Sequence, residues 1–369
     1  MVMPENIVGS YTGWGKLKKV VVGEFHPADY FDVLPDSAFK ERMQKLSIES
    51  IEDLKNLKQT IRSLDVEVFE LENFFKKPGV HSNGYLSVIN PRPPFTPRDN
   101  LHFIDNKMFS FFTADQPIRF FDDFAHHDLF VKFAKQGAEW HQMPKGYYNI
   151  DKEKQLDYID QDRGIGENTP YLDGSNFTKC GNKIYYTLEN TANEFGLQWF
   201  KNIIGDKIEF IKYKNTKLFR NHVDSIVKII KPGLVLCNFS KEDLVESIPE
   251  MASWEVIHLP IEKNTMRLKL NEYRKDNGFS HEIENWSQDW IEQWADDDII
   301  NTNFDLNILS VDENTVLIPN KNPEFEKMLK KHNVDTIVCN LRHRFFWGNG
   351  INCMTSEVLR EDECINYFK

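Results

Sequence analysis

A cysteine near the end of the chain follows two closely spaced glycines, in the segment 348–356 (GNGINCMTS). Glycine adopts backbone conformations that other residues avoid, so Cys353 is expected on a tightly turned, crowded loop. A thiol becomes a nucleophile when a histidine and a carboxylate lie close to it, and both occur at 173–176 (DGSN) and 222–224 (HVD). The sequence therefore contains the parts of a covalent catalyst. A buried structural thiol is the commoner state of cysteine and is the alternative.

His222 and Asp224 are separated by one residue. If they belong to one strand, as we predict, their side chains point to the same side of it. A histidine in that position can deliver and accept protons near neutral pH. A metal site formed with Cys353 is a second interpretation, although these residues lack the short spacing of common metal-binding motifs.

Aspartates begin the first predicted strand of several successive units: Asp99, Asp173, Asp224 and Asp305. If these strands radiate from one axis, the carboxylates gather around it. A guanidinium is flat and carries five donors, so it suits several carboxylates at fixed angles and relieves their mutual repulsion. For Asp305 alone, a strand-end cap or turn residue is the preferred interpretation.

The chain repeats the same order of secondary-structure elements, although its amino-acid sequence contains no repeat. Hairpins are predicted at 98–112, 173–187, 222–238 and 305–319, and each is followed by a helix and a further strand. An N-terminal unit has a strand at 16–23, a helix at 38–64 and a strand at 66–71, but it lacks a first strand. The segment after Cys353 can supply that strand. One helix is expected to begin at the N-cap Ser240.

These five ββαβ units predict an α/β fold in which small mixed sheets surround a central channel, a five-bladed α/β propeller. A doubly wound α/β sheet is the alternative. Hairpins argue against it, and no GxGxxG follows an early strand. Residues 1–369 are expected to form a single domain, with loops at 77–97 and 145–171 and an insertion at about 263–298. Tryptophans at helical spacing in that insertion indicate the packed side of a helix.

Composition limits the kinds of partner. The 369 residues are 40% hydrophobic, which excludes a disordered or collagen-like chain, and the formal net charge of −12 argues against nucleic acid as the main partner. No run approaches the roughly 20 apolar residues of a membrane helix, so a soluble protein without a membrane partner is expected. Five widely spaced cysteines without CxxC favour free thiols and a cytosolic location.

Four segments, in order, carry a resemblance to a known family: 96–99 (TPRD), 171–177 (YLDGSNF), 221–224 (NHVD) with 233–236 (GLVL), and 348–353 (GNGINC). Together they resemble the amidinotransferases, which include glycine and inosamine amidinotransferases. That family belongs to the guanidino-modifying pentein superfamily of five-bladed α/β propellers. The resemblance extends from about residue 97 to residue 357.

The resemblance implies amidino transfer through a covalent intermediate. Cys353 would attack the guanidinium carbon of a donor, expected to be arginine, release ornithine, and pass the amidino group to an amine. His222 would exchange protons with the leaving and entering amines, and Asp173 would hold the histidine or the guanidinium. Asp99 and Asp224 would bind guanidinium nitrogens.

The resemblance implies further substrate contacts at Arg119, Lys241 and Asn301. Lys241 stands where glycine amidinotransferase has an arginine for the donor carboxylate, and Asn301 lies near the position of a serine pair. Asn352 stands where the family often has histidine. No metal or organic cofactor is expected, and a homodimer is the oligomer under consideration. Two rival functions are an arginine hydrolase on the same fold and a non-catalytic propeller that binds a guanidino compound or a protein.

Overall fold

The strands form five three-stranded sheets and a separate two-stranded sheet in the part of the chain that the structure describes. This computed structural model describes residues 6–34, 38–72, 80–82, 87–89, 93–113, 119, 122–145, 169–188, 191–213, 222–259 and 306–368. In each three-stranded sheet the central strand pairs antiparallel on one side and parallel on the other. The sheets are therefore mixed, as the predicted hairpins require.

Five sheets share this pattern, and the chain order of their strands repeats. The first contains β17 (Thr355–Glu361), β1 (Lys16–Val22) and β2 (Glu67–Glu70); the second contains β5 (Leu101–Ile104), β6 (Lys107–Ser110) and β7 (Glu139–Gln142); the third contains β8 (Phe177–Cys180), β9 (Lys183–Tyr186) and β10 (Glu209–Lys212). The fourth contains β11 (Val227–Lys231), β12 (Leu234–Cys237) and β13 (Glu255–His258); the fifth contains β14 (Leu309–Asp312), β15 (Thr315–Ile318) and β16 (Asp335–Val338). The short hairpin β3 (Val80–Ser82) and β4 (Ser87–Ile89) stands apart.

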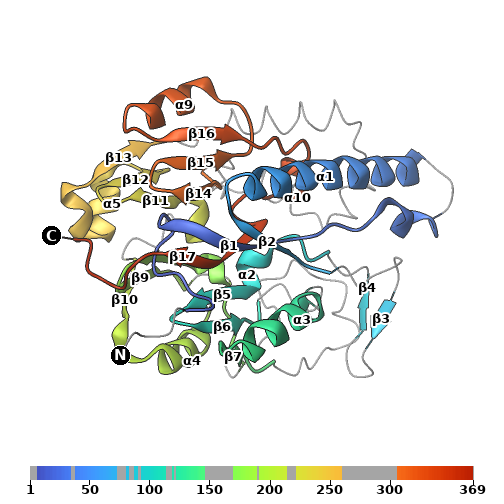
Figure 1. The fold of residues 1–369 in the computed structure, drawn as a ribbon, viewed down its shortest axis with the longest axis horizontal. Helices are drawn as coiled ribbons and strands as arrows, with labels where there is room; N and C mark the ends of the chain where they lie inside the picture. Colours follow the sequence, from blue (N-terminus) through green and yellow to red (C-terminus); the bar gives the residue numbers. More distant parts are fainter. Residues whose placement is uncertain are drawn as a thin grey trace.

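A helix precedes the parallel edge strand of every three-stranded sheet, as predicted (Figure 1). These helices are α1 (Ala38–Arg62), α3 (Asp122–Lys135), α4 (Glu194–Ile204), α5 (Lys241–Ser247) and α9 (Pro323–Lys330). Two one-turn helices, α2 (Pro97–Asn100) and α10 (Arg344–Trp347), lie between sheets in the chain order. The predicted cap of α5 is confirmed, because the Ser240 side chain accepts a hydrogen bond from the Asp243 N–H at 3.2 Å.

The tail of the chain completes the N-terminal sheet. Strand β17 pairs antiparallel with β1, with Thr355 opposite Val22 and Glu361 opposite Lys16. The prediction that the segment after Cys353 supplies the missing strand of the first unit is thus confirmed. Because β17 begins two residues after Cys353, this pairing fixes the loop that carries the thiol.

Five hydrophobic clusters join the sheets in a cyclic order. One cluster packs the first sheet on the second, and others pack the second on the third, the third on the fourth and the fourth on the fifth. A fifth cluster packs the fifth sheet back on the first, with Leu309 and Leu317 against Val20 and Val22. The observed fold is therefore α/β, with five mixed sheets in place of one doubly wound sheet. A propeller closed around a channel remains a prediction.

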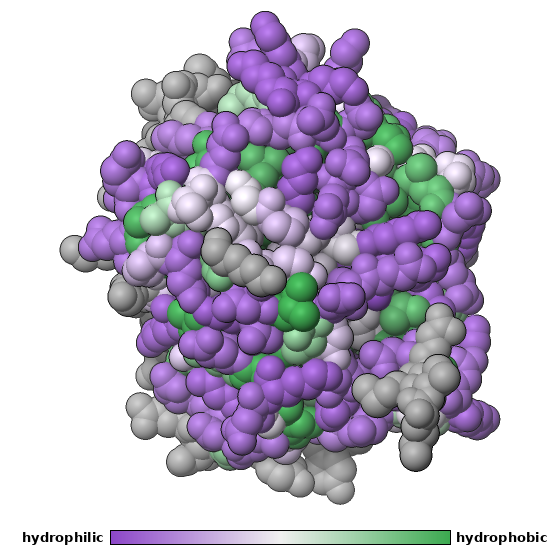
Figure 2. Space-filling model, turned by 60° about the vertical axis from the view of Figure 1, so that its left-hand side comes forward, coloured by the Kyte–Doolittle hydropathy of each residue, from purple (hydrophilic) through white to green (hydrophobic). Residues whose placement is uncertain are grey.

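The face of the molecule in Figure 2 is mostly hydrophilic, with hydrophobic residues exposed in small separate groups. Among the helices that the structure describes, none is both long and apolar enough to span a bilayer. The predicted insertion at 263–298 lies outside the described residues, as does most of the predicted loop at 145–171. The single-domain assignment stays a prediction.

Candidate active site

Short turns carry the predicted site residues into the first strands of three sheets. Asp99 belongs to α2, directly before β5, and Asp173 precedes the 3₁₀ turn η2 (Gly174–Asn176), directly before β8. His222 precedes the 3₁₀ turn η5 (Val223–Ser225), which contains Asp224. The three turns occupy the same position in their units, and the side chains of Asp99, Asp173 and His222 lie close together.

The prediction that His222 and Asp224 lie in one strand is wrong. The strand β11 begins only at Val227, and the backbone N–H of Ile226 donates to the carbonyl of Val223 at 3.0 Å. This hydrogen bond closes a turn, so the alternation of side chains along a strand does not apply to residues 222–224. The charge of Asp224 nevertheless acts on His222 and helps to raise the pKa of its imidazole.

Close backbone packing holds two of these turns against each other. A Cβ atom on Gly174 would lie 2.5 Å from the carbonyl oxygen of Arg98, closer than real Cβ atoms come. Only glycine lets η2 approach α2 in this way. The contact brings Asp173 close to Asp99.

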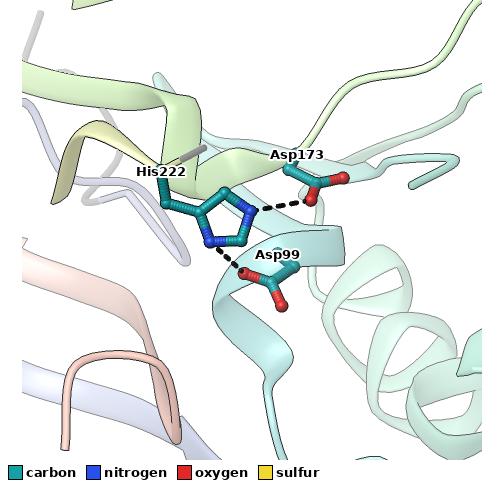
Figure 3. Close-up of side chains that lie close together, drawn as sticks. All are labelled: Asp99, Asp173 and His222. Carbon is teal, nitrogen blue, oxygen red and sulfur yellow. Dashed lines mark hydrogen bonds and ion pairs between the residues drawn. The ribbon is translucent and has the colours of Figure 1, made fainter. Parts of the chain in front are cut away.

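The imidazole of His222 lies between these two carboxylates (Figure 3). Its Nε2 is 3.0 Å from Oδ2 of Asp173, and its Nδ1 is 3.8 Å from Oδ1 of Asp99. The imidazole side chain is 21% exposed, whereas Asp173 is fully buried. Burial alone would lower the pKa of His222, but Asp99, Asp173 and Asp224 together raise it to about 9. The ring is therefore an imidazolium at neutral pH and can act as a general acid.

The same three groups have the composition of a metal site. Ligand atoms of Asp99, Asp173 and His222 lie within 4.8 Å of one another, a different set from the one considered in the sequence, which included Asp224 and Cys353. A metal ion would have to displace a proton from an imidazole whose pKa the two carboxylates raise. The arrangement therefore suits proton transfer better than metal binding.

Arg119 holds Asp99 from the opposite side. Its Nη1 is 2.6 Å from Oδ2 of Asp99, its Nε is 2.9 Å from Oδ2 of Asp122, and its Nη2 donates to the Thr96 carbonyl at 3.0 Å. The guanidinium is almost completely buried. Arg119 thus fixes the carboxylate expected to bind substrate, and direct contact between Arg119 and substrate stays a prediction.

Cys353 is held by one asparagine through two hydrogen bonds. The amide nitrogen of Asn307 donates to Cys353 Sγ at 2.9 Å, and its amide oxygen accepts from the Cys353 backbone N–H at 2.9 Å. The backbone N–H of Cys353 can only donate a hydrogen bond, so the Asn307 atom next to it must be the amide oxygen. The amide nitrogen of Asn307 then lies next to the sulfur. Asn307 therefore determines where the thiol points.

Burial and charge keep the resting thiol protonated. Cys353 is 7% exposed, and burial raises its pKa, with further increases from Asp224 and Asp99. The hydrogen bond from Asn307 acts in the opposite direction. Asp99 and Asp224 also act on His222, so the thiol, the imidazole and these two carboxylates belong to one electrostatic environment.

The crowded loop predicted around Cys353 is observed. Gly348 ends α10 in the left-handed conformation with φ of 56°. A Cβ atom on Gly350 would lie 2.6 Å from the Cβ atom of Asn307, so this glycine lets Asn307 reach the loop. The absence of a side chain at Gly350 thus makes room for the side chain of Asn307.

No protein-family model matches the sequence. The chain is nevertheless 24% identical to the mitochondrial glycine amidinotransferase of Xenopus tropicalis, over 98% of this chain and 85% of that protein. It is also 24% identical to the L-arginine:L-lysine amidinotransferase of Pseudomonas savastanoi pv. phaseolicola, over 98% and 96% of the two chains. The chain is a homologue of the amidinotransferases. These relatives support an enzyme that transfers amidino groups.

Solved structures support the fold of this amidinotransferase homologue. An amidinotransferase of saxitoxin biosynthesis from Microseira wollei superposes with a TM-score of 0.70 at 21% identity, covering 98% of this chain and 99% of the other. Dimethylarginine dimethylaminohydrolase superposes with a TM-score of 0.53 at 11% identity, covering 93% of this chain and all of the other. The chain shares its α/β fold with both of these enzymes.

The remaining predicted residues of the homologue lie elsewhere. Lys241 is the exposed first residue of α5, and within the described part of the chain no contact joins it to the site, so its role stays a prediction. Asn301 and Asp305 lie outside the described residues. Asn307 was missed because only the acidic residues before first strands were considered. It stands two residues before β14, where the pattern of polar residues before first strands could have indicated it.

Proposed function

We propose that this homologue transfers the amidino group of arginine to an amine through a covalent intermediate on Cys353, releasing ornithine. The observation that carries the proposal is geometric: the imidazole of His222 lies against Asp99 and Asp173, and Asp224 accepts a hydrogen bond from Asn352, the residue directly before Cys353. A donor guanidinium bound by these carboxylates would have its carbon next to the sulfur of Cys353. Its leaving nitrogen would lie next to the imidazolium of His222. The relatives named for arginine and for amine substrates support the same chemistry.

We also propose that the five sheets form a five-bladed propeller around a channel, within a single domain. The cyclic order of the five hydrophobic clusters supports this arrangement. In such a ring the turns before the first strands meet at one end of the channel, where the donor would enter.

Binding of the donor would prepare the nucleophile. The carboxylates Asp99 and Asp224 raise the pKa of the Cys353 thiol, so a guanidinium placed between them removes part of that effect. The amide of Asn307 would then donate to the sulfur as it becomes a thiolate. The nucleophile would therefore form mainly when a cationic donor is present.

In the first half of the reaction, the sulfur would form a bond to the guanidinium carbon and release the thiol proton to solvent. As the bond from carbon to the ornithine nitrogen breaks, the imidazolium of His222 would give its proton to that nitrogen. The positive charge of the amidino group is retained on the enzyme, where the carboxylates stabilise it. Asp173 would keep the imidazole oriented through its contact with Nε2.

In the second half, an acceptor amine would attack the same carbon while the neutral imidazole takes a proton from it. The bond from carbon to sulfur breaks, and the released thiolate regains its proton from solvent. Both halves together restore the thiol and the imidazolium. The reaction needs no external oxidant or reductant.

An arginine hydrolase on the same fold is the second candidate, and the likeness to dimethylarginine dimethylaminohydrolase favours keeping it. Arginine would be incubated with the enzyme with and without glycine or lysine, and ornithine, citrulline and ammonia would be quantified. The transferase predicts catalytic release of ornithine only with an acceptor. Citrulline and ammonia formed without an amine would contradict it and support the hydrolase.

A control protein carrying Cys353→Ser should form neither set of products. Arginine binding without product formation by the wild-type protein, under all acceptor conditions, would support the non-catalytic alternative. We further propose a cytosolic protein acting on small molecules, with a homodimer as the oligomer to be tested. Support for the compartment comes from its five free cysteines.

A further inference from the structure

The side chain of Asn352, directly before the nucleophile, connects three buried charged groups. Its amide nitrogen donates to Oδ2 of Asp224 at 2.6 Å. Its amide oxygen accepts from Nζ of Lys228 at 2.8 Å and from Nη2 of Arg98 at 3.2 Å. All four side chains are buried, so water does not compete freely with these hydrogen bonds.

Charge determines the orientation of this amide. Lysine and arginine can only donate hydrogen bonds, and an ionised carboxylate can only accept them. The oxygen of Asn352 must therefore face Lys228 and Arg98, and its nitrogen must face Asp224. The two cations polarise the amide and strengthen its donation to the carboxylate.

Arg98 is itself held by two further contacts. Nη1 of Arg98 is 2.5 Å from Oε2 of Glu357, and the Arg98 Nε–H donates to the backbone carbonyl of Asn352 at 3.4 Å. Glu357 belongs to β17 and Lys228 to β11, so the amide is held by two different sheets. The hydrogen bond from the Asn352 amide therefore restricts the position of the Asp224 carboxylate. Asp224 itself lies in a turn of only three residues.

We propose that Asn352 is a positioning residue that holds the Asp224 carboxylate in the orientation that binds the donor guanidinium. This inference rests on the proposed function, because it takes Asp224 to be a guanidinium ligand. Burial, together with the nearby Asp99, raises the pKa of Asp224 above its usual value, and His222, Arg98 and Lys228 offset only part of that increase. The amide of Asn352 adds a short hydrogen bond that favours the ionised carboxylate.

The test compares the binding of arginine with that of citrulline, which has an uncharged urea in place of the guanidinium. Both affinities would be measured by calorimetry in a Cys353→Ser background, where no covalent chemistry occurs. Asn352→Ala should lower the ratio of arginine affinity to citrulline affinity by about 10–100-fold, the effect expected of a hydrogen bond to a charged group. A merely structural defect would weaken both ligands equally.

Asn352→His is the matched conservative variant. A neutral imidazole offers one N–H donor for Asp224 and one nitrogen acceptor, enough for one of the two cations, so it should recover most of the ratio that Asn352→Ala loses. Asn314→Ala, in the exposed turn between β14 and β15, is the control and should leave the ratio unchanged.

The inference is overturned if Asn352→Ala is folded and keeps the ratio, or if Asn352→His is as defective as Asn352→Ala. These results do not depend on turnover. The proposed function fails separately, if wild-type enzyme forms no amidino adduct and no ornithine. If Asn352 discriminates arginine from citrulline but the protein shows no turnover, the positioning role of Asn352 stands and the proposed enzymatic function is wrong.

Discussion

His222 shows how neighbouring charge can outweigh burial at a single residue. Its ring lies between the carboxylates of Asp173 and Asp99, and its pKa is raised to about 9 although burial acts in the opposite direction. A protonated imidazole is the form required to expel an amine, so the enzyme would be ready for the first half of its reaction at neutral pH.

The raised pKa of His222 predicts how the first half of the reaction depends on pH. His222 should stay protonated through neutrality and lose its proton near pH 9, so amidino-cysteine formation should slow above that pH. The stability from the protonated ring is fully present below the unfolded pKa of about 6.5 and is lost as the pH rises through about 9. Histidine NMR titration of the Cys353→Ser protein measures this pKa, and His222→Asn assigns the signal. A His222 signal titrating near 6.5 would contradict the assignment.

Asn307 supports a second prediction, about the thiol. Asn307→Asp keeps an oxygen for the Cys353 backbone N–H but replaces the donor beside Sγ with a negative charge. The rate of Cys353 alkylation by iodoacetamide at a fixed pH should fall roughly 10–100-fold, because a hydrogen bond to the charged sulfur is lost. Asn314→Asp makes the same chemical change in an exposed turn and should have no effect. Equal rates for both variants would remove Asn307 from this role.

Turns, more than strands, position the site. The aspartates before the first strands were recognised in the sequence because the order of elements repeats, and Asp99, Asp173 and Asp224 do lie in one environment with His222. The 3₁₀ turn at His222 could not be predicted from alternation, because the hydrogen bond that closes it leaves no periodic signal. Asn307 was not predicted because only acidic residues were considered before the first strands, although it stands two residues before β14.

Gly174 gives a prediction for these turns. An alanine there would meet the backbone of α2, so η2 and α2 must separate. We expect Gly174→Ala to lose about 1–3 kcal/mol of unfolding free energy and to lower the pKa of His222, since Asp173 and Asp99 move apart. Chemical denaturation and histidine titration measure the two effects.

Gly13→Ala is the matched control, because nothing lies within 4 Å of its added Cβ atom. It should change neither quantity. Wild-type stability and an unchanged His222 pKa in Gly174→Ala would contradict the role given to this contact.

The five sheets depend on one another across the whole protein. Every hydrophobic cluster contains side chains of two neighbouring sheets, and β17, at the end of the chain, completes the sheet of β1. The repeating units and the role of the tail could be predicted because they follow from local patterns. The lengths of the turns and the contacts of Arg119 depend on tertiary packing, and the sequence pattern did not specify them.

This interdependence predicts cooperative unfolding. Because each sheet shares its core with two others, the protein should unfold in a single calorimetric transition whose van't Hoff and calorimetric enthalpies agree. Two resolved transitions would contradict the proposed single domain. A variant that weakens one cluster, Leu317→Ala between the fifth and first sheets, should move the single transition to lower temperature without splitting it.

The role of Cys353 as the carrier of the amidino group can be measured directly by intact-protein mass spectrometry after incubation with arginine and no acceptor. We predict a mass gain equal to one amidino group on the wild-type protein, located at Cys353 by peptide mapping and absent from Cys353→Ala. A wild-type protein that gains no mass and releases no ornithine would contradict covalent amidino transfer at this site.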